Sequence, residues 1–109
     1  MTEYIIIITT TNSKSNAKLI ASSLVENKLA ACVQIIPKIK STFKWKDLIT
    51  EEKEILILIK TNSMLADDIK RKIKKHHNYE TPEIISFPFN ILTDDYKEWF
   101  DLSVGEKLE

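Results

Sequence analysis

Glycine, cysteine and arginine are nearly absent from this chain of 109 residues, and each scarcity limits the sites that it can form. Gly105 is the only glycine, so the glycine-rich loops that hold phosphates in P-loop and dinucleotide-binding proteins cannot form. Cys32 is the only cysteine, so no internal disulfide can form, which suits a reducing compartment.

Charge excess and long apolar runs are missing as well. Lysine and arginine together number 16, as do aspartate and glutamate, so the formal net charge is zero. Proteins that bind nucleic-acid backbones usually have a strong excess of basic residues. Because this chain has none, we expect no nucleic-acid partner. No apolar run approaches the roughly 20 residues that a membrane helix needs. The N-terminus shows neither a basic lead nor a cleavage site, so the sequence predicts a cytoplasmic protein with no membrane partner.

Two segments, 4–8 and 55–59, have the composition of fully buried strands. Apart from Tyr4 they contain only isoleucine and leucine, and their short length and β-branched content favour strands over helices. Successive strand residues point to opposite faces, so neither face of 55–59 carries a polar group. Such a strand belongs in a sheet that is covered on both sides.

Helical spacing appears in two other segments. Apolar residues from Ala17 to Val25 recur at i, i+3, i+4, i+7 and i+8, after a loop over 9–13, and predict a helix that ends at Asn27-Lys28. A second helix is expected to be capped by Asn62 or Ser63 and to fray around residues 76–78. Its buried stripe consists of Leu65, Ile69 and Ile73.

The remaining strands are expected over 29–36 and 83–89. Residues near 33–60 are predicted to form one long hairpin, in which Pro37 marks an edge position or a bulge. Lys46-Asp47 is the expected turn of this hairpin, although glycine is missing there.

These elements predict a single α+β domain over residues 1–104. A short helix follows Thr93, and 105–109 is a polar tail. With right-handed crossovers the order β-α-β-β-α-β gives a ferredoxin-like antiparallel sheet. Its two helices cover one face, and a soluble monomer rarely exposes an apolar patch beyond a few hundred Å². We therefore expect other copies or a partner to cover the second face.

The pair His76-His77 is the first candidate for chemistry. Imidazole binds copper, zinc and nickel well, but neighbouring helix residues point about 100° apart, whereas metal-binding pairs usually lie at i and i+4. A histidine at a helix C-terminus also stabilises the helix dipole. The residues alone favour this structural role over metal binding, which needs a third ligand from another segment.

Other candidates have simple structural alternatives. Cys32 lies within a strand, which favours a buried thiol over a nucleophile. For Lys70–Lys75 we favour a solvated helix face over an anion site. Trp45 lies at the tip of the hairpin, where packing on a neighbouring subunit is favoured over ligand stacking. Glu54 and Lys60 flank the apolar strand as solvated charges and become functional only where oligomer edges form a cleft.

Catalysis and RNA binding are both disfavoured. An RNA-recognition sheet stacks bases on strand aromatics, which the two apolar strands lack beyond Tyr4. A phosphatase of this fold needs an anion cradle in its first loop, and Thr9–Ser13 contains neither arginine nor glycine. No nucleophile–base pair with an orienting group is visible, so we expect no enzyme and no organic cofactor.

Several motifs, in order and spacing, resemble the CutA family of divalent-ion tolerance proteins from Ile5 to about Ser103. They are Leu29-Ala30-Ala31-Cys32-Val33-Gln34-Ile35-Ile36-Pro37, Ser41-Thr42-Phe43-Lys44-Trp45, Glu54 through Thr61, His77-Asn78-Tyr79-Glu80-Thr81-Pro82-Glu83-Ile84 and Tyr96-Lys97-Glu98-Trp99.

The resemblance implies a cytoplasmic homotrimer whose sheets pack inward and whose hairpin clasps a neighbour. It implies binding of copper(II) or another divalent cation at His76 and His77, in a tolerance or homeostasis role. The third copper ligand of some members, a cysteine, corresponds to Thr9, and the usual proline after the second histidine corresponds to Asn78. It also implies an inter-subunit ligand cleft that contains Trp45, Glu54, Lys60, His77 and Tyr79. The alternative function is that of a PII-like sensor or scaffold whose clefts bind an anionic metabolite.

Overall fold

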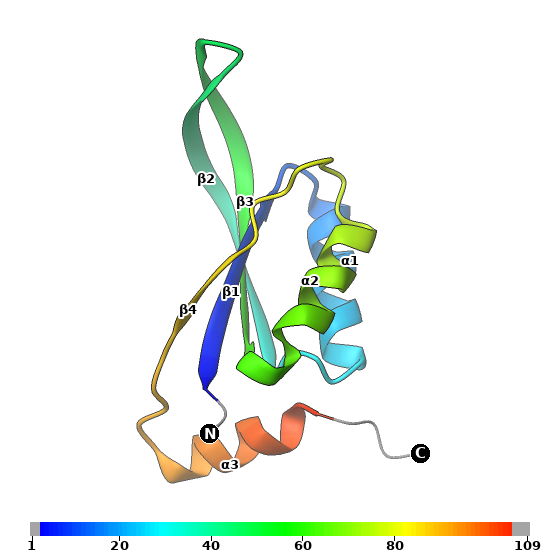
Figure 1. The fold of residues 1–109 in the computed structure, drawn as a ribbon, viewed down its shortest axis with the longest axis vertical. Helices are drawn as coiled ribbons and strands as arrows, with labels where there is room; N and C mark the ends of the chain where they lie inside the picture. Colours follow the sequence, from blue (N-terminus) through cyan, green and yellow to red (C-terminus); the bar gives the residue numbers. More distant parts are fainter. Residues whose placement is uncertain (1–2, 106–109) are drawn as a thin grey trace.

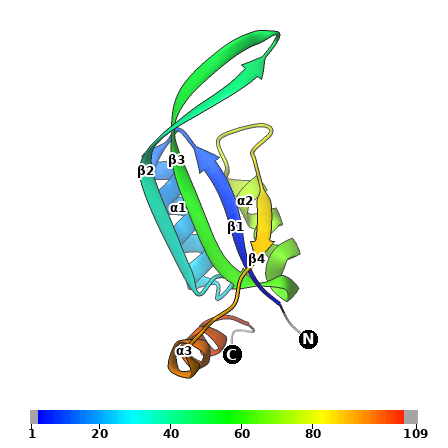
Figure 2. The ribbon, with the colours of Figure 1, turned by 90° about the vertical axis from the view of Figure 1, so that its left-hand side faces the viewer.

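One antiparallel sheet with the strand order β2-β3-β1-β4 organises the chain, of which this computed structural model describes residues 3–105. Helices α1 and α2 lie side by side on one face of the sheet (Figure 1), and Figure 2 shows the opposite face without a covering helix. The order and pairing are those of the predicted ferredoxin-like α+β fold. The elements are β1 (Tyr4–Thr11), α1 (Lys14–Glu26), β2 (Cys32–Trp45), β3 (Leu48–Asn62), a 3₁₀ turn (Ser63–Leu65), α2 (Ala66–His76), β4 (Ile85–Pro88) and α3 (Asp94–Ser103).

The core lies between the helices and the sheet. Alternate residues of β1 and β3 point toward the helices, where they meet the apolar faces of α1 and α2. Val25 was predicted to share the apolar face of α1 but is 45% exposed. The buried cluster consists of Ile5, Ile7, Ala17, Ile20, Leu24, Ala30, Ile55, Ile57, Ile59, Ile69 and Ile73.

Polar side chains cap α1 and the 3₁₀ turn. The Ser13 hydroxyl accepts a hydrogen bond from the Asn16 amide at 3.1 Å and caps α1. The Asn62 side chain accepts one from the Met64 amide at 3.0 Å, but it caps the 3₁₀ turn, and α2 begins only at Ala66.

The hairpin of β2 and β3 extends well beyond the helical layer (Figure 1) and makes the molecule 47 Å long. Strand β2 lies at the edge of the sheet, and its register with β3 shifts between Ile36 and Ile39, around Pro37. Lys46 and Asp47 both have positive φ, at 49° and 64°, as a two-residue type I′ turn requires. The predicted hairpin, its bulge and its turn are confirmed.

Three predicted boundaries were wrong. Strand β1 continues from Ile8 to Thr11, because Thr9 and Thr11 pair with β3. Strand β2 begins at Cys32 and not at residue 29, because the amides of Leu29 and Ala30 donate to the Leu24 carbonyl and so close α1. Strand β4 covers only Ile85–Pro88 of the expected 83–89.

Helix α3 packs across one end of the sheet (Figures 1 and 2). Phe100 is fully buried, with its ring centroid 5.2 Å from that of Tyr4. The Tyr4 hydroxyl donates to Asp101 at 2.7 Å. In the expected polar tail, residues 106–109 lie outside the described part of the chain. None of the helices within 3–105 has the length and apolar content needed to cross a lipid bilayer.

Candidate functional site

The imidazole of His77 is held by two backbone groups. His77 follows the last residue of α2, and its Nε2 lies 2.8 Å from the Thr10 carbonyl oxygen of β1. The Tyr79 amide donates to Nδ1 at 3.0 Å. Because a carbonyl can only accept, Nε2 carries the proton and Nδ1 is the acceptor. The two contacts therefore fix the neutral tautomer and occupy both ring nitrogens.

Burial favours this neutral form of His77. Loss of solvent around the ring lowers the pKa of His77 below its ordinary value of 6.5. The hydrogen bond to Thr10 and the charge of Glu54 act in the opposite direction but do not cancel the effect of burial. The ring is therefore uncharged at neutral pH.

Tyr79 connects this ring to a buried carboxylate. Its hydroxyl donates to Oε2 of Glu54 at 2.6 Å, and Glu54 is only 8% exposed. The rings of His77 and Tyr79 lie 4.9 Å apart between centroids. Burial, followed by the contact with Glu54, raises the pKa of Tyr79 well above its ordinary value of 10.0. Tyr79 therefore remains a hydrogen-bond donor at any physiological pH.

Asparagine side chains attach the same segment to the end of β1. The Thr11 hydroxyl donates to Oδ1 of Asn78, whose Nδ2 donates to Asn12 Oδ1 at 2.7 Å. The Asn16 side chain donates to the His76 carbonyl at 2.6 Å and so satisfies one carbonyl at the C-terminus of α2. Sequence reasoning missed these residues. The run of threonines and asparagine after the first apolar strand is the signal that could have identified them.

A single chain brings together only part of the predicted cleft. Glu54, His77 and Tyr79 form one cluster, whereas Lys60 lies six residues further along β3, roughly 20 Å from Glu54 in an extended strand. Trp45 is 61% exposed at the far end of the hairpin. Lys60 instead lines a separate hollow of about 320 Å³, with Ile6, Phe89, Asn90, Ile91, Leu92, Thr93 and Tyr96.

The donors within residues 3–105 do not complete a metal site. Residues 3–105 contain no group of three or more histidine, cysteine or acidic side chains placed to hold a metal. Both nitrogens of His77 are engaged, while the half-buried His76 ring forms no hydrogen bond with the described residues. Thr9, at the position of the third ligand, is fully buried.

A family model matches almost the whole chain and so establishes the family. The family described as "CutA1 divalent ion tolerance protein" matches residues 5–103. The chain belongs to the CutA1 family. The motifs from Leu29 to Trp99 therefore identified the family correctly.

Relatives of known name agree with the CutA1 assignment. The "Divalent-cation tolerance protein CutA" of Thermus thermophilus is 34% identical over 100 residues, which cover 92% of this chain and 97% of that protein. "Protein CutA, chloroplastic" of Arabidopsis thaliana is 35% identical over 95 residues, 87% of this chain. The match covers 52% of that plant protein, so this chain spans about half its length.

Solved CutA1 structures have the same fold. That of CutA1 from Oryza sativa superposes with a TM-score of 0.91 at 34% identity, and the match covers 96% of each chain. The CutA1 assignment and the fold thus agree, while the ligand residues named above remain predictions.

Proposed function

We propose that this CutA1 family member is a non-enzymatic, cytoplasmic homotrimer that binds a divalent cation, copper foremost, in cation tolerance or homeostasis. The observation that carries the assembly is the open face of the sheet. Ile36, Ile85 and Phe87 on this face are 42%, 53% and 44% exposed.

These side chains belong to one continuous apolar surface. Directly paired strand residues share a face of the sheet, and the register places Phe87 beside Ile6 and Ile85 beside Ile8. Ile8 is opposite Leu58, and Leu56 is opposite Ile36. The apolar residues of the open face are Ile6, Ile8, Ile36, Leu56, Leu58, Ile85 and Phe87, and Gln34 and Lys60 lie beside them.

Further copies of the chain are the occupants that fit this face best. The chain has no net formal charge, so copies meet without long-range repulsion. The tip of the hairpin offers further apolar surface, because Trp45 and its partner Leu48 are 61% and 70% exposed on one face and Ile49 is 80% exposed on the other. In the proposed trimer, three sheets turn their open faces inward and each hairpin lies against a neighbour.

Sedimentation equilibrium tests the assembly. We expect a mass three times that of the 12.6 kDa chain at micromolar concentration. Ile36→Asp places a charge on the open face and should reduce this mass. Leu19→Asp is the matched control, because Leu19 is 46% exposed on α1 and lies outside that face. A single-chain mass for the unmodified protein, with a native circular dichroism spectrum, refutes the assembly.

Copper is the proposed cation because, among the divalent first-row metals, imidazole nitrogen binds copper with the highest affinity. His77 can bind it only if its ring gives up Thr10 or the Tyr79 amide, whereas the His76 ring has no such bond within the described residues. Since residues 3–105 contain no group of three or more such donors placed to hold a metal, we expect a complete site to need groups from a neighbouring copy.

Copper titration by calorimetry on the metal-free protein tests this site. We expect His76→Gln to weaken binding strongly and His77→Gln to weaken it less. Equal, weak binding by the unmodified protein and by both variants refutes a histidine site.

The alternative is a sensor that binds a small anionic ligand in inter-subunit clefts. It is favoured because both ring nitrogens of His77 already form hydrogen bonds and are not open to a metal. In this alternative Trp45, Glu54, Lys60 and Tyr79 meet only across subunits, because one chain keeps Lys60 and Trp45 away from Glu54. Native mass spectrometry of the purified assembly distinguishes the two functions. A retained organic anion that is lost in Lys60→Gln supports the sensor, and retained copper supports the first proposal.

A further inference from the structure

The helical layer carries a positive charge that the net charge of the chain conceals. Helices α1 and α2 contain seven lysine and arginine residues against three carboxylates, a net formal charge of +4 with histidine neutral. The remainder of the neutral chain therefore carries −4. Because both helices lie on the same face of the sheet (Figure 1), this positive charge is concentrated on one side of the molecule.

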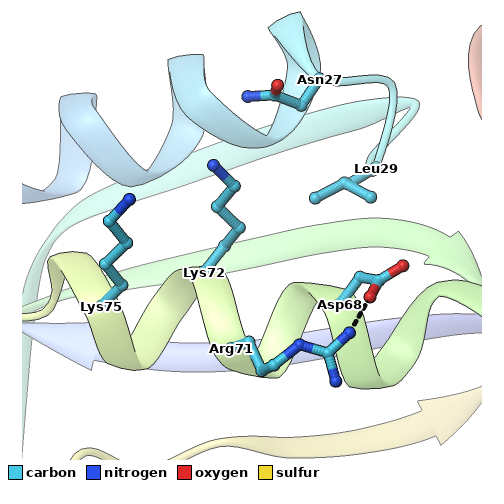
Figure 3. A pocket seen from close by; sticks show the side chains of 6 residues that line it. All are labelled: Asn27, Leu29, Asp68, Arg71, Lys72 and Lys75. Atoms are coloured by element: carbon cyan, nitrogen blue, oxygen red, sulfur yellow. Dashed lines mark hydrogen bonds and ion pairs between the residues drawn. The ribbon is translucent and has the colours of Figure 1, made fainter. Parts of the chain in front are cut away.

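A hollow of about 380 Å³ lies within this layer, between the end of α1 and α2. Lys72 and Lys75 extend into it from α2 toward α1 (Figure 3). They are three residues apart and share one face of the helix, at an axial spacing of about 4.5 Å. Two ammonium groups at this spacing can contact one phosphate group together. The lining is completed by Asn27, Leu29, Asp68 and Arg71.

The charges of the hollow are unequally compensated. Arg71 forms an ion pair with Asp68 (Figure 3), so this acidic group is neutralised by its own neighbour. Within residues 3–105, neither Lys72 nor Lys75 takes part in an ion pair. Lys72 is half-buried, and a partly desolvated ammonium gains more from an anion than a fully solvated one. The hollow thus contains two uncompensated cations.

We propose that this hollow binds a small phosphate-bearing anion, held by the ammonium groups of Lys72 and Lys75. A diphosphate fits the volume, and its negative charge is complementary to the two lysines. The site lies within one chain and on the side opposite the open face of the sheet. It therefore does not require the trimer, and Lys72 and Lys75 are not among the proposed cation ligands.

Calorimetry with pyrophosphate on the metal-free chain of 109 residues tests the proposal. We expect binding at low salt, weakened at least about tenfold in Lys72→Gln/Lys75→Gln, because two charge-assisted contacts are lost. Lys70→Gln/Lys74→Gln removes the same charge from the same helix but leaves the lining of the hollow intact. It should weaken binding by less than about threefold, as expected for a distant, screened charge.

Further variants distinguish a specific site from a folding defect or a general effect of charge. Lys72→Arg/Lys75→Arg keeps both charges and should retain binding, and a native circular dichroism spectrum of Lys72→Gln/Lys75→Gln excludes a folding defect as the cause of the loss. Equal weakening by the two glutamine pairs overturns the proposal, because the anion then responds only to the overall field. Loss of binding in Lys60→Gln overturns it as well, and so does absence of binding to the unmodified protein.

Discussion

Tyr79→Phe removes one hydroxyl from the candidate cluster and leaves the ring in place. The lost group donates to a Glu54 carboxylate that is 8% exposed, at 2.6 Å. A hydrogen bond to a charged group contributes about 1.5–3 kcal/mol. Tyr79 itself is only half-buried, so water can replace part of the interaction. We therefore expect the free energy of unfolding to fall by about 1.5 kcal/mol, the lower end of this range.

Urea unfolding at fixed protein concentration measures this loss. A double-mutant cycle with Glu54→Gln isolates the pairwise contribution, which we expect to be about 1 kcal/mol. Tyr96→Phe is the control, because the Tyr96 hydroxyl forms no hydrogen bond with the described residues. It should change stability by less than about 0.5 kcal/mol. A coupling energy below about 0.3 kcal/mol, the usual error of additivity, contradicts the proposed interaction.

Three further predictions concern the tautomer, the core and the turn. Burial lowers the folded pKa of His77 below 6.5, so the unfolded chain binds more protons between the two pKa values. The contribution of His77 to the free energy of unfolding is then complete above about pH 6.5 and is lost as the pH falls through the pKa of the folded state. In His77→Gln the urea midpoint, measured with EDTA present, should therefore fall less as the pH is lowered. Ile57→Ala, at a fully buried position, should cost about 2–5 kcal/mol in the same assay, against less than about 1 for the 45% exposed Val25→Ala. Lys46→Asn/Asp47→Gly, at two positive-φ positions, should raise the thermal midpoint through a gain of about 1 kcal/mol; no gain would mean that the turn is unstrained.

Elements with a strong repeating pattern were predicted well. The apolar run of β3 predicted a buried strand. In the structure the helices cover one face of the sheet, and Ile55, Ile57 and Ile59 on that face are buried. Pro37 indicated the bulge, since proline cannot donate to the ladder. The end of β1 was missed, because threonines suit a loop as well as a strand and only pairing with β3 decides between them.

The residues of the candidate site were predicted from the family resemblance, but the hydrogen bonds between them were not predicted. Neither composition nor spacing indicates that Tyr79, separated from Glu54 by a hairpin arm and a helix, donates to its carboxylate. The neutral tautomer of His77 was equally inaccessible, because it depends on the Thr10 carbonyl of a distant strand. Lys72 and Lys75 were assigned to a solvated helix face, and the hollow beside them exists only because α1 packs against α2.

Local sequence determined the type and order of the elements of this protein, since hydrophobic periodicity acts between residues a few positions apart, while several element boundaries depended on pairing. Even the apolar character of the open face of the sheet follows from the alternation of side chains along β1 and β3. Tertiary structure alone decided which polar groups from distant segments meet. Hydrogen-bond partners such as Tyr79 and Glu54, or His77 and Thr10, are 25 and 67 residues apart. Their distances depend on how helices and strands pack, a property that no single segment contains.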